Sequence, residues 1–123
     1  MWSDRYNYYN IQFDTHFSQK LDKSVVVNCL LETKLFKQTS HQAFTNVDDF
    51  PWVTILLVET YDGNFSSSDK ENQFVTLISI VCSKGQNIDS QIYIDIFKQI
   101  ANELNWKLYL EEDDAGNENI EIK

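Results

Sequence analysis

The side chains that could carry chemistry in this 123-residue chain are its two histidines, its two cysteines and its nineteen carboxylates. His16 and His41 lie in separate segments, with no HExxH pair and no CxxC pair, so the ligand spacing of a zinc site is missing. Residues 113–118 are acid-rich, but their spacing does not match an EF-hand calcium loop. The three glycines form neither a GxGxxG motif nor a Walker loop. We therefore expect no metal and no cofactor.

Nucleophilic catalysis would require a serine or cysteine beside a histidine and an orienting acid. The GxSxG motif is absent, and Cys29 could meet His16 or His41 only through the fold. Cys29 and Cys82 each lie among Val, Leu and Ile, where a thiolate is poorly stabilised. We expect both to be buried free thiols, with a single disulfide as the alternative. The sequence favours a protein that is not an enzyme; a small enzyme assembled from scattered residues is an alternative.

The formal net charge of −9 is unevenly distributed. Residues 1–40 hold four acids and five bases, whereas residues 41–123 hold fifteen acids and five bases. Such a field repels nucleic acid and anionic lipid, and it speeds the encounter with a basic protein. We therefore expect a protein partner, and neither nucleic acid nor a membrane. No apolar run approaches the roughly 20 residues of a membrane-spanning helix, and the start MWSDRYNYYN lacks a basic and then apolar leader, so we expect a cytoplasmic protein.

Three acid-rich segments contain aromatic residues that could anchor a contact. Aromatic anchors inside a charged rim are a common interface plan, and carboxylates bind arginine through two hydrogen bonds. The groups are Asp48, Asp49, Phe50 and Trp52; then Tyr61, Asp62, Phe65, Asp69 and Glu71; and last Trp106, Tyr109, Glu111, Glu112, Asp113, Asp114 and Glu118. The carboxylates of these groups, together with Tyr61, are the predicted partner-binding residues. Trp52 and Trp106 border predicted strands, so we expect both in the core rather than exposed.

These residues must be positioned by a mixture of strands and helices. Residues 6–13 alternate between apolar or aromatic and polar side chains, which predicts a first strand. From Thr15 apolar residues recur every four positions, at Phe17, Leu21, Val25 and Cys29, which favours a helix within residues 15–37. Three consecutive valines make a strand over Val25–Leu31 the alternative.

The rest of the chain predicts a sheet with one further helix. Two aliphatic runs, Trp52–Thr60 and Phe74–Cys82, indicate an antiparallel pair joined by a polar loop. Ser90 begins an amphipathic helix, and residues 107–111 and 119–122 alternate as a closing hairpin with Gly116 in its turn. We predict one α+β domain over residues 1–123, in which two helices cover one face of an antiparallel sheet. Its order is βαββαβ, extended by the last strand of the C-terminal hairpin.

Residues 50–123 contain the aliphatic pair WVTILLVET and FVTLISIVC, then the segment QIYIDIFKQIANELNWKLYL, which runs into EEDDAGNENIEI. In this layout the chain resembles the small acidic immunity proteins of bacterial toxin systems, particularly those of contact-dependent growth inhibition. The resemblance implies a cytoplasmic protein that protects the producing cell by binding a cognate toxin domain, often a basic nuclease. It would block the active site of the toxin, or bind an exosite and block substrate access.

Two other binding functions would show the same charge pattern. One is an acidic adaptor domain, and the other is an inhibitor that mimics nucleic acid without any link to toxin immunity. Gene neighbourhood separates them from an immunity protein, because an immunity gene lies directly after the gene that encodes its toxin.

Overall fold

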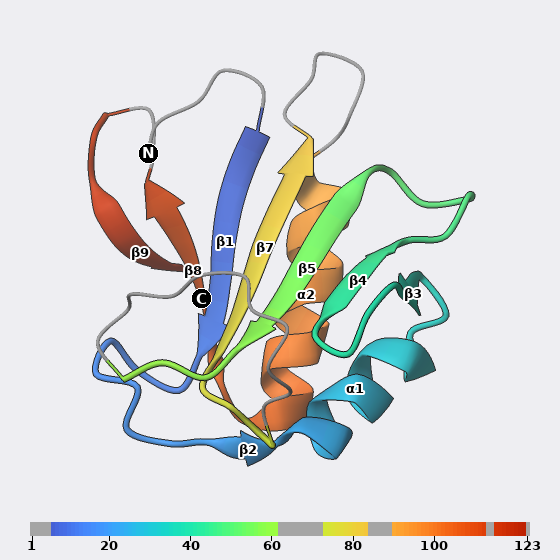
Figure 1. Ribbon diagram of the computed structural model, residues 1–123. Coiled ribbons are helices and arrows are strands. Elements are labelled where there is room, and N and C mark those ends of the chain that lie inside the picture. Colours follow the sequence, from blue (N-terminus) through green and yellow to red (C-terminus); the bar gives the residue numbers. More distant parts are fainter. Residues whose placement is uncertain (1–5, 62–72, 84–89, 113–114, 123) are drawn as a thin grey trace.

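The computed structural model describes residues 6–61, 73–83, 90–112 and 115–122, apart from the side chains of Ser90 and Glu112. The predicted α+β class is confirmed: seven antiparallel strands form a sheet in the order β3-β4-β5-β7-β1-β8-β9, and β2 pairs separately with β6 (Figure 1). The strands are β1 (Tyr6–Gln12), β2 (Leu21–Asp22), β3 (Phe36–Gln38), β4 (Ala43–Asn46), β5 (Val53–Val58), β6 (Phe74–Val75), β7 (Leu77–Ser83), β8 (Lys107–Glu112) and β9 (Glu118–Ile122). The helices are α1 (Lys23–Glu32) and α2 (Ser90–Leu104).

The long elements follow the predicted connectivity. β1, α1, β5, β7, α2 and β8 succeed one another along the chain, and their strands lie in the order β5-β7-β1-β8. This is the ferredoxin-like βαββαβ arrangement. β9 extends the sheet beyond β8 as the second strand of the closing hairpin. The hairpin of β3 and β4, which the sequence did not predict, extends the sheet beyond β5.

One hydrophobic core joins one face of the sheet to both helices. Successive strand residues point to opposite faces, so Tyr9 and Ile11 share a face with Ile80 and Ile78, their partners on β7. The helices supply buried side chains to the same core: Val26, Cys29 and Leu30 from α1, and Tyr93, Phe97, Ile100, Ala101 and Leu104 from α2. The helices therefore cover one face and leave the other face, which we call the outer face, without a helix.

The first helix begins later than the sequence predicts. The Asp14 carboxylate accepts hydrogen bonds from the backbone N–H groups of His16 at 3.0 Å and Ser18 at 3.1 Å, and from the Ser18 hydroxyl. The bonds from Ser18, more than that from His16, hold the pKa of Asp14 below its ordinary value. Phe17, inside this turn, has a φ of 55°, which is not helical. The predicted helix is confirmed only over Lys23–Glu32, and the alternative of a strand through its valines is wrong.

The register gives the sheet two distinct ends. Val53 pairs with Cys82, which pairs with Asn7, so β5 begins, β7 ends and β1 begins at the same end. We call this the Trp52 end, because Trp52 directly precedes β5. At the opposite end β1 finishes and β8 begins with Lys107, and we call this the Lys107 end. In Figure 1 the Trp52 end is at the top.

Both cysteines are buried free thiols, as the sequence predicts, Cys29 on α1 and Cys82 on β7. Burial raises the pKa of Cys82 to about 12. Within the described part of the chain, neither helix has the length and apolar character needed to cross a membrane.

Candidate protein-binding surface

The first acidic group lies in the connection between β4 and β5. Asp48 and Asp49 are exposed, whereas Phe50 turns inward and is 9% exposed. Asn46 fixes the connection: its side-chain NH₂ donates to the carbonyl of Phe50 at 3.0 Å, and its side-chain oxygen accepts from the N–H of Val53 at 3.2 Å. The two carboxylates are therefore carried by a connection whose backbone is held at both sides.

Trp52 points away from the core, so the prediction that it is a core residue is wrong. Its side chain is 43% exposed, and its ring lies 5.5 Å from the ring of Tyr6, which is 39% exposed. Strand alternation explains this orientation, because Val53 faces the core and the preceding residue must face the other way. Trp106, the other tryptophan expected in the core, is buried at 5% exposure and confirms the prediction.

The backbone of Trp52 is hydrogen-bonded to Tyr93 of α2. The Tyr93 hydroxyl donates a hydrogen bond of 2.8 Å to the carbonyl of Trp52, which also accepts a longer bond of 3.4 Å from the N–H of Ser83. Tyr93 is fully buried, with its ring 5.8 Å from Phe50 in an edge-on contact and 5.9 Å from Phe97 in a stacked one. Trp52 is thus an exposed side chain on a backbone that the core holds in place.

Most of the second acidic group lies outside the described residues, namely Asp62, Phe65, Asp69 and Glu71. Tyr61 is described and is 59% exposed. Its hydroxyl donates to Glu59 Oε2 at 2.8 Å, and this bond, followed by desolvation and then the charge of Glu59, raises the pKa of Tyr61. Since Tyr61 follows β5, it lies at the Lys107 end, away from Asp48 and Asp49.

The aromatics of the third group are both buried: Trp106 belongs to the core, whereas Tyr109, between the core-facing Leu108 and Leu110, lies on the outer face. Trp106 and Tyr109 are each 5% exposed, which excludes them as exposed anchors. Burial, then the charges of Glu121 and Asp14, raises the pKa of Tyr109.

The acids of the third group occupy the closing hairpin. Glu118 is exposed, and its backbone pairs with that of Glu112, whose side chain is not described. Glu111 is half-buried, and because Leu110 faces the core, Glu111 lies on the outer face. Asp113 and Asp114 lie outside the described residues.

The structure brings two of the three groups to one end of the sheet. The β4–β5 connection and the turn of the β8–β9 hairpin both open at the Trp52 end, on opposite sides of β7 and β1. Trp52 and Tyr6 lie between them. Lys34 lies at this end as well, in the turn before β3. Tyr6 is not among the partner-binding residues predicted from the sequence, although the alternation of β1 places it on the face opposite to that of the buried Tyr9.

The residues considered for catalysis are not brought together. Cys29 donates a hydrogen bond from Sγ to Glu103 Oε2 at 3.2 Å, and burial, this bond and nearby acidic charge raise its pKa to about 12. His16 follows β1 and His41 precedes β4, and β5 and β7 separate those two strands in the sheet. A protonated thiol bonded to a carboxylate is a poor nucleophile.

The described residues also contain no group of three His, Cys, Asp or Glu side chains arranged to hold a metal ion. The open hollow of about 270 Å³ beside Cys29, between α1 and α2, is lined by Glu32 and Glu103 but by no histidine.

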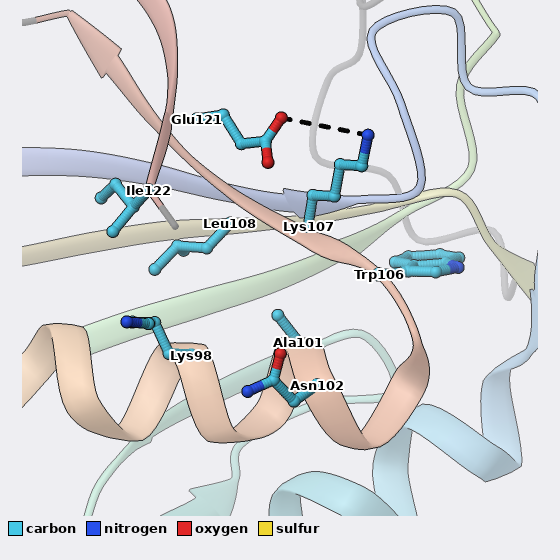
Figure 2. A pocket seen from close by; sticks show the side chains of 8 residues that line it. All are labelled: Lys98, Ala101, Asn102, Trp106, Lys107, Leu108, Glu121 and Ile122. Atoms are coloured by element: carbon cyan, nitrogen blue, oxygen red, sulfur yellow. Dashed lines mark ion pairs between the residues drawn. The ribbon is translucent and has the colours of Figure 1, made fainter.

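A second hollow, of about 190 Å³, lies between α2 and the β8–β9 hairpin (Figure 2). Lys98 and Asn102 approach it from the helix, and Lys107 and Glu121 approach it from the strands. Lys107 Nζ lies 3.9 Å from Glu121 Oε1, so part of the positive charge is already balanced. The lining is a mixture of charges and apolar groups that selects no ligand class.

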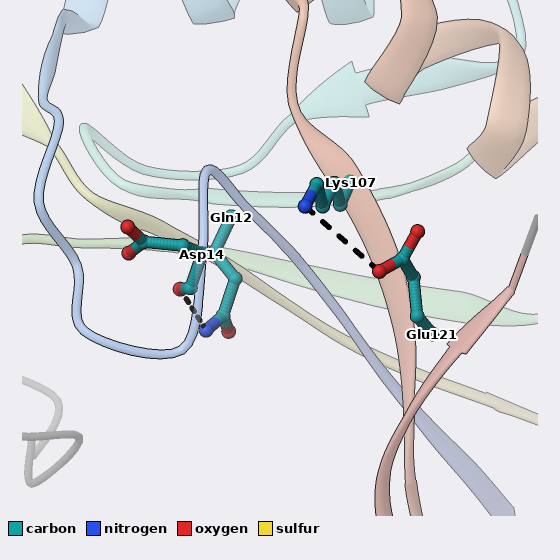
Figure 3. Close-up of polar contacts among 4 residues, drawn as sticks. All are labelled: Gln12, Asp14, Lys107 and Glu121. Carbon is teal, nitrogen blue, oxygen red and sulfur yellow. Dashed lines mark hydrogen bonds and ion pairs between the residues drawn. The ribbon is translucent and has the colours of Figure 1, made fainter.

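Several polar groups at the Lys107 end contact one another or an aromatic ring. The Gln12 side chain donates to the backbone carbonyl of Asp14 at 2.6 Å, on the strand beside the Lys107–Glu121 pair (Figure 3). The ammonium group of Lys20 lies 4.1 Å from the centre of the Phe74 ring. This end therefore carries charges of both signs.

Comparison with models of known protein families, with curated protein sequences and with solved structures gives no match.

Proposed function

We propose that this chain is a protein-binding domain that neutralises a basic partner, and that the partner is a toxin nuclease domain from which the chain protects the producing cell. Its binding surface is the Trp52 end of the sheet. Binding there blocks either the active site of the nuclease or the path of its substrate.

The observation that carries the proposal is the placement of exposed carboxylates at the Trp52 end. Asp48 and Asp49 stand on one side of that end, and Glu118 stands on the other. A nuclease binds the phosphates of its substrate with basic side chains. An inhibitor that presents carboxylates to the same side chains competes with the phosphates and repels the nucleic acid that would replace it.

The mixed charge of the Lys107 end strengthens the argument. At the Lys107 end, Lys107 and Lys20 offset part of the charge of acids such as Glu121, whereas at the Trp52 end Asp48, Asp49 and Glu118 outnumber Lys34. The attraction for a basic partner is therefore directed by the carboxylates of the Trp52 end. A net charge of −9 alone would attract a basic protein without orienting it. The unequal charge of the two ends of the sheet provides the orientation.

The test is co-expression of the full chain with the nuclease domain encoded by the gene directly preceding its own. We expect the two proteins to co-purify and the complex to lack nuclease activity, with activity restored when the chain is removed by denaturation and the nuclease is refolded. Failure of the two proteins to bind would overturn the proposal. Binding without loss of activity would indicate an adaptor instead.

A further inference from the structure

We infer that Trp52 and Tyr6 form the centre of the binding surface, and that they receive an arginine side chain of the partner. This inference rests on the proposed function and names the contact at which the partner docks. Central aromatic residues with a surrounding charged rim dominate the binding energy of many interfaces.

The position of the pair between the two acidic groups supports this assignment. Trp52 directly precedes β5, and Tyr6 begins β1, two strands away. The Asp48–Asp49 connection lies beyond β5, and the hairpin that carries Glu111 lies beyond β1. Neighbouring strands are about 4.8 Å apart, so β5 and β8 are separated by about 14 Å, which a single protein interface covers easily.

The pair is also fixed before a partner arrives. The Tyr93 hydroxyl holds the carbonyl of Trp52, and the inward Phe50 anchors the connection two residues earlier. The rings of Trp52 and Tyr6 contact each other at an interplanar angle of 51°. A side chain on a fixed backbone and against a neighbouring ring loses less conformational freedom on binding, so more of the contact energy appears as affinity.

Arginine fits this site better than an apolar residue or lysine. Its guanidinium group stacks on aromatic faces, carries a permanent positive charge and is more weakly hydrated than an ammonium group. It can also form two parallel hydrogen bonds with one carboxylate, and Asp48, Asp49 and Glu111 supply carboxylates at the same end of the sheet. An apolar partner residue would leave these acids without a counter-charge.

The first experiment measures the affinity of the nuclease domain for Trp52→Ala, by calorimetry. We expect the Kd to rise by at least about 30-fold, as for a central aromatic residue of an interface. Val25→Ala is the control, because Val25 is 47% exposed on α1 and lies on the helix side of the sheet; its Kd should stay within about twofold. If the nuclease binds the wild-type chain but Trp52→Ala changes the Kd less than threefold, the inference is wrong and the proposed function stands.

The second experiment needs no nuclease. The ¹⁵N-labelled full chain is titrated with a seven-residue arginine peptide and, separately, with a seven-residue lysine peptide. We expect saturable shifts of the Trp52 indole N–H and the Tyr6 amide, with a lower Kd for the arginine peptide. Shifts centred on other carboxylates, or equal affinities for both peptides, would overturn the inference. This result holds even if the neighbouring nuclease fails to bind, so the two proposals are tested separately.

Discussion

Phe50 and Trp52 are separated only by Pro51, yet Phe50 is 9% exposed and Trp52 is 43% exposed. Trp52 borders a predicted strand, which is why it was expected in the core, whereas Phe50 was grouped with the possible anchors of a contact. The alternation of β5 could have corrected this, since an inward Val53 forces Trp52 outward once the strand is known to begin at Val53. Assigning the wrong alternate set of residues to the core face is enough to reverse the orientation of such a residue.

The two residues should therefore respond differently to truncation. Phe50→Ala removes a ring that contacts Phe36 and Tyr93, so we expect the free energy of unfolding to fall by about 3–5 kcal/mol. Trp52→Ala removes an exposed ring and should change it by less than about 1 kcal/mol. Urea denaturation followed by circular dichroism measures both. Phe50→Leu, which keeps most of the volume, should be intermediate, and equal losses for Phe50→Ala and Trp52→Ala would contradict the orientations.

The raised pKa values of the buried Cys82 and Tyr9 predict that the free energy of unfolding falls at alkaline pH. Burial raises the pKa of Cys82 from 9.0 to about 12, and burial together with Cys82 raises that of Tyr9 from 10.0 to about 12. Both groups are neutral in the folded chain while the unfolded chain ionises them, so stability is complete below pH 9 and is lost as the pH rises from 9 towards 12. Urea denaturation at several pH values should show the free energy of unfolding falling across this range.

Cys82→Ala provides the control for this prediction. The variant lacks the thiol, so its free energy of unfolding should fall less steeply with pH, by up to about 1.4 kcal/mol per pH unit. Its stability near pH 8 should also be lower, because the substitution leaves a cavity in the core. An unchanged slope would show that the Cys82 thiol ionises in the folded chain as readily as in the unfolded one.

At the scale of elements, the sequence predicted the long strands and both helices because their apolar patterns are long. It failed where side chains override the pattern: the Asp14 carboxylate binds the backbone of His16 and Ser18, and this turn delays the start of α1. The valines of α1 are helical despite their β-branching, because Val26 packs into the core with Leu30 four positions later.

The short strands had no pattern to reveal them. β3 has three residues, and β2 and β6 have two each, which is too short for alternation to be recognised. The predicted strand over residues 74–82 is divided at Thr76, whose hydroxyl accepts from the N–H of Thr60 at 2.7 Å and donates to its carbonyl at 2.6 Å. Such contacts depend on residues distant in the sequence, so they could not be predicted from the local pattern.

The closing hairpin supplies a prediction about its turn. Gly116 has a φ of 86°, and a β-carbon placed there would meet no atom within 4 Å. The cost of Gly116→Ala therefore comes from the left-handed backbone rather than from a clash, and we expect about 1 kcal/mol of lost stability by urea denaturation. Gly116→Asn should cost less, because asparagine tolerates this conformation. If Gly116→Ala were more stable than the wild-type chain, the turn would not require the left-handed conformation at this position.

At the scale of the whole molecule, strand order and direction decide which end of the sheet each acidic group occupies. Asp48 and Glu118 are seventy residues apart in the chain but lie at the same end of the sheet, whereas Tyr61, closer to Asp48 in sequence, lies at the other end. The sequence identified the candidate residues but not this partition, because the partition depends on strand order and direction. Trp52 and Tyr6 likewise become neighbours only when β7 is placed between β5 and β1.

The partition can be tested by changing the net charge by the same amount at either end of the sheet. Asp48→Lys with Asp49→Lys reverses two acids at the Trp52 end, and Asp22→Lys with Glu59→Lys reverses two acids at the Lys107 end. Both pairs change the net charge equally. If the partner is steered to the Trp52 end, the first pair should slow association with the nuclease domain about tenfold at low salt, and the second by less than about threefold.

The salt dependence of the rate distinguishes steering from contact loss. Stopped-flow association rates measured from about 20 to 300 mM salt should fall steeply for the wild-type chain, because salt screens attraction over the distance of approach. Reversal of Glu111, Glu112, Asp113 and Asp114 to Lys in the closing hairpin should slow association in the same way as the Asp48 and Asp49 reversal, and both should flatten the salt dependence. If instead the reversals at the two ends slow association equally, net charge rather than its placement governs the encounter, and the Trp52 end has no privileged part in steering.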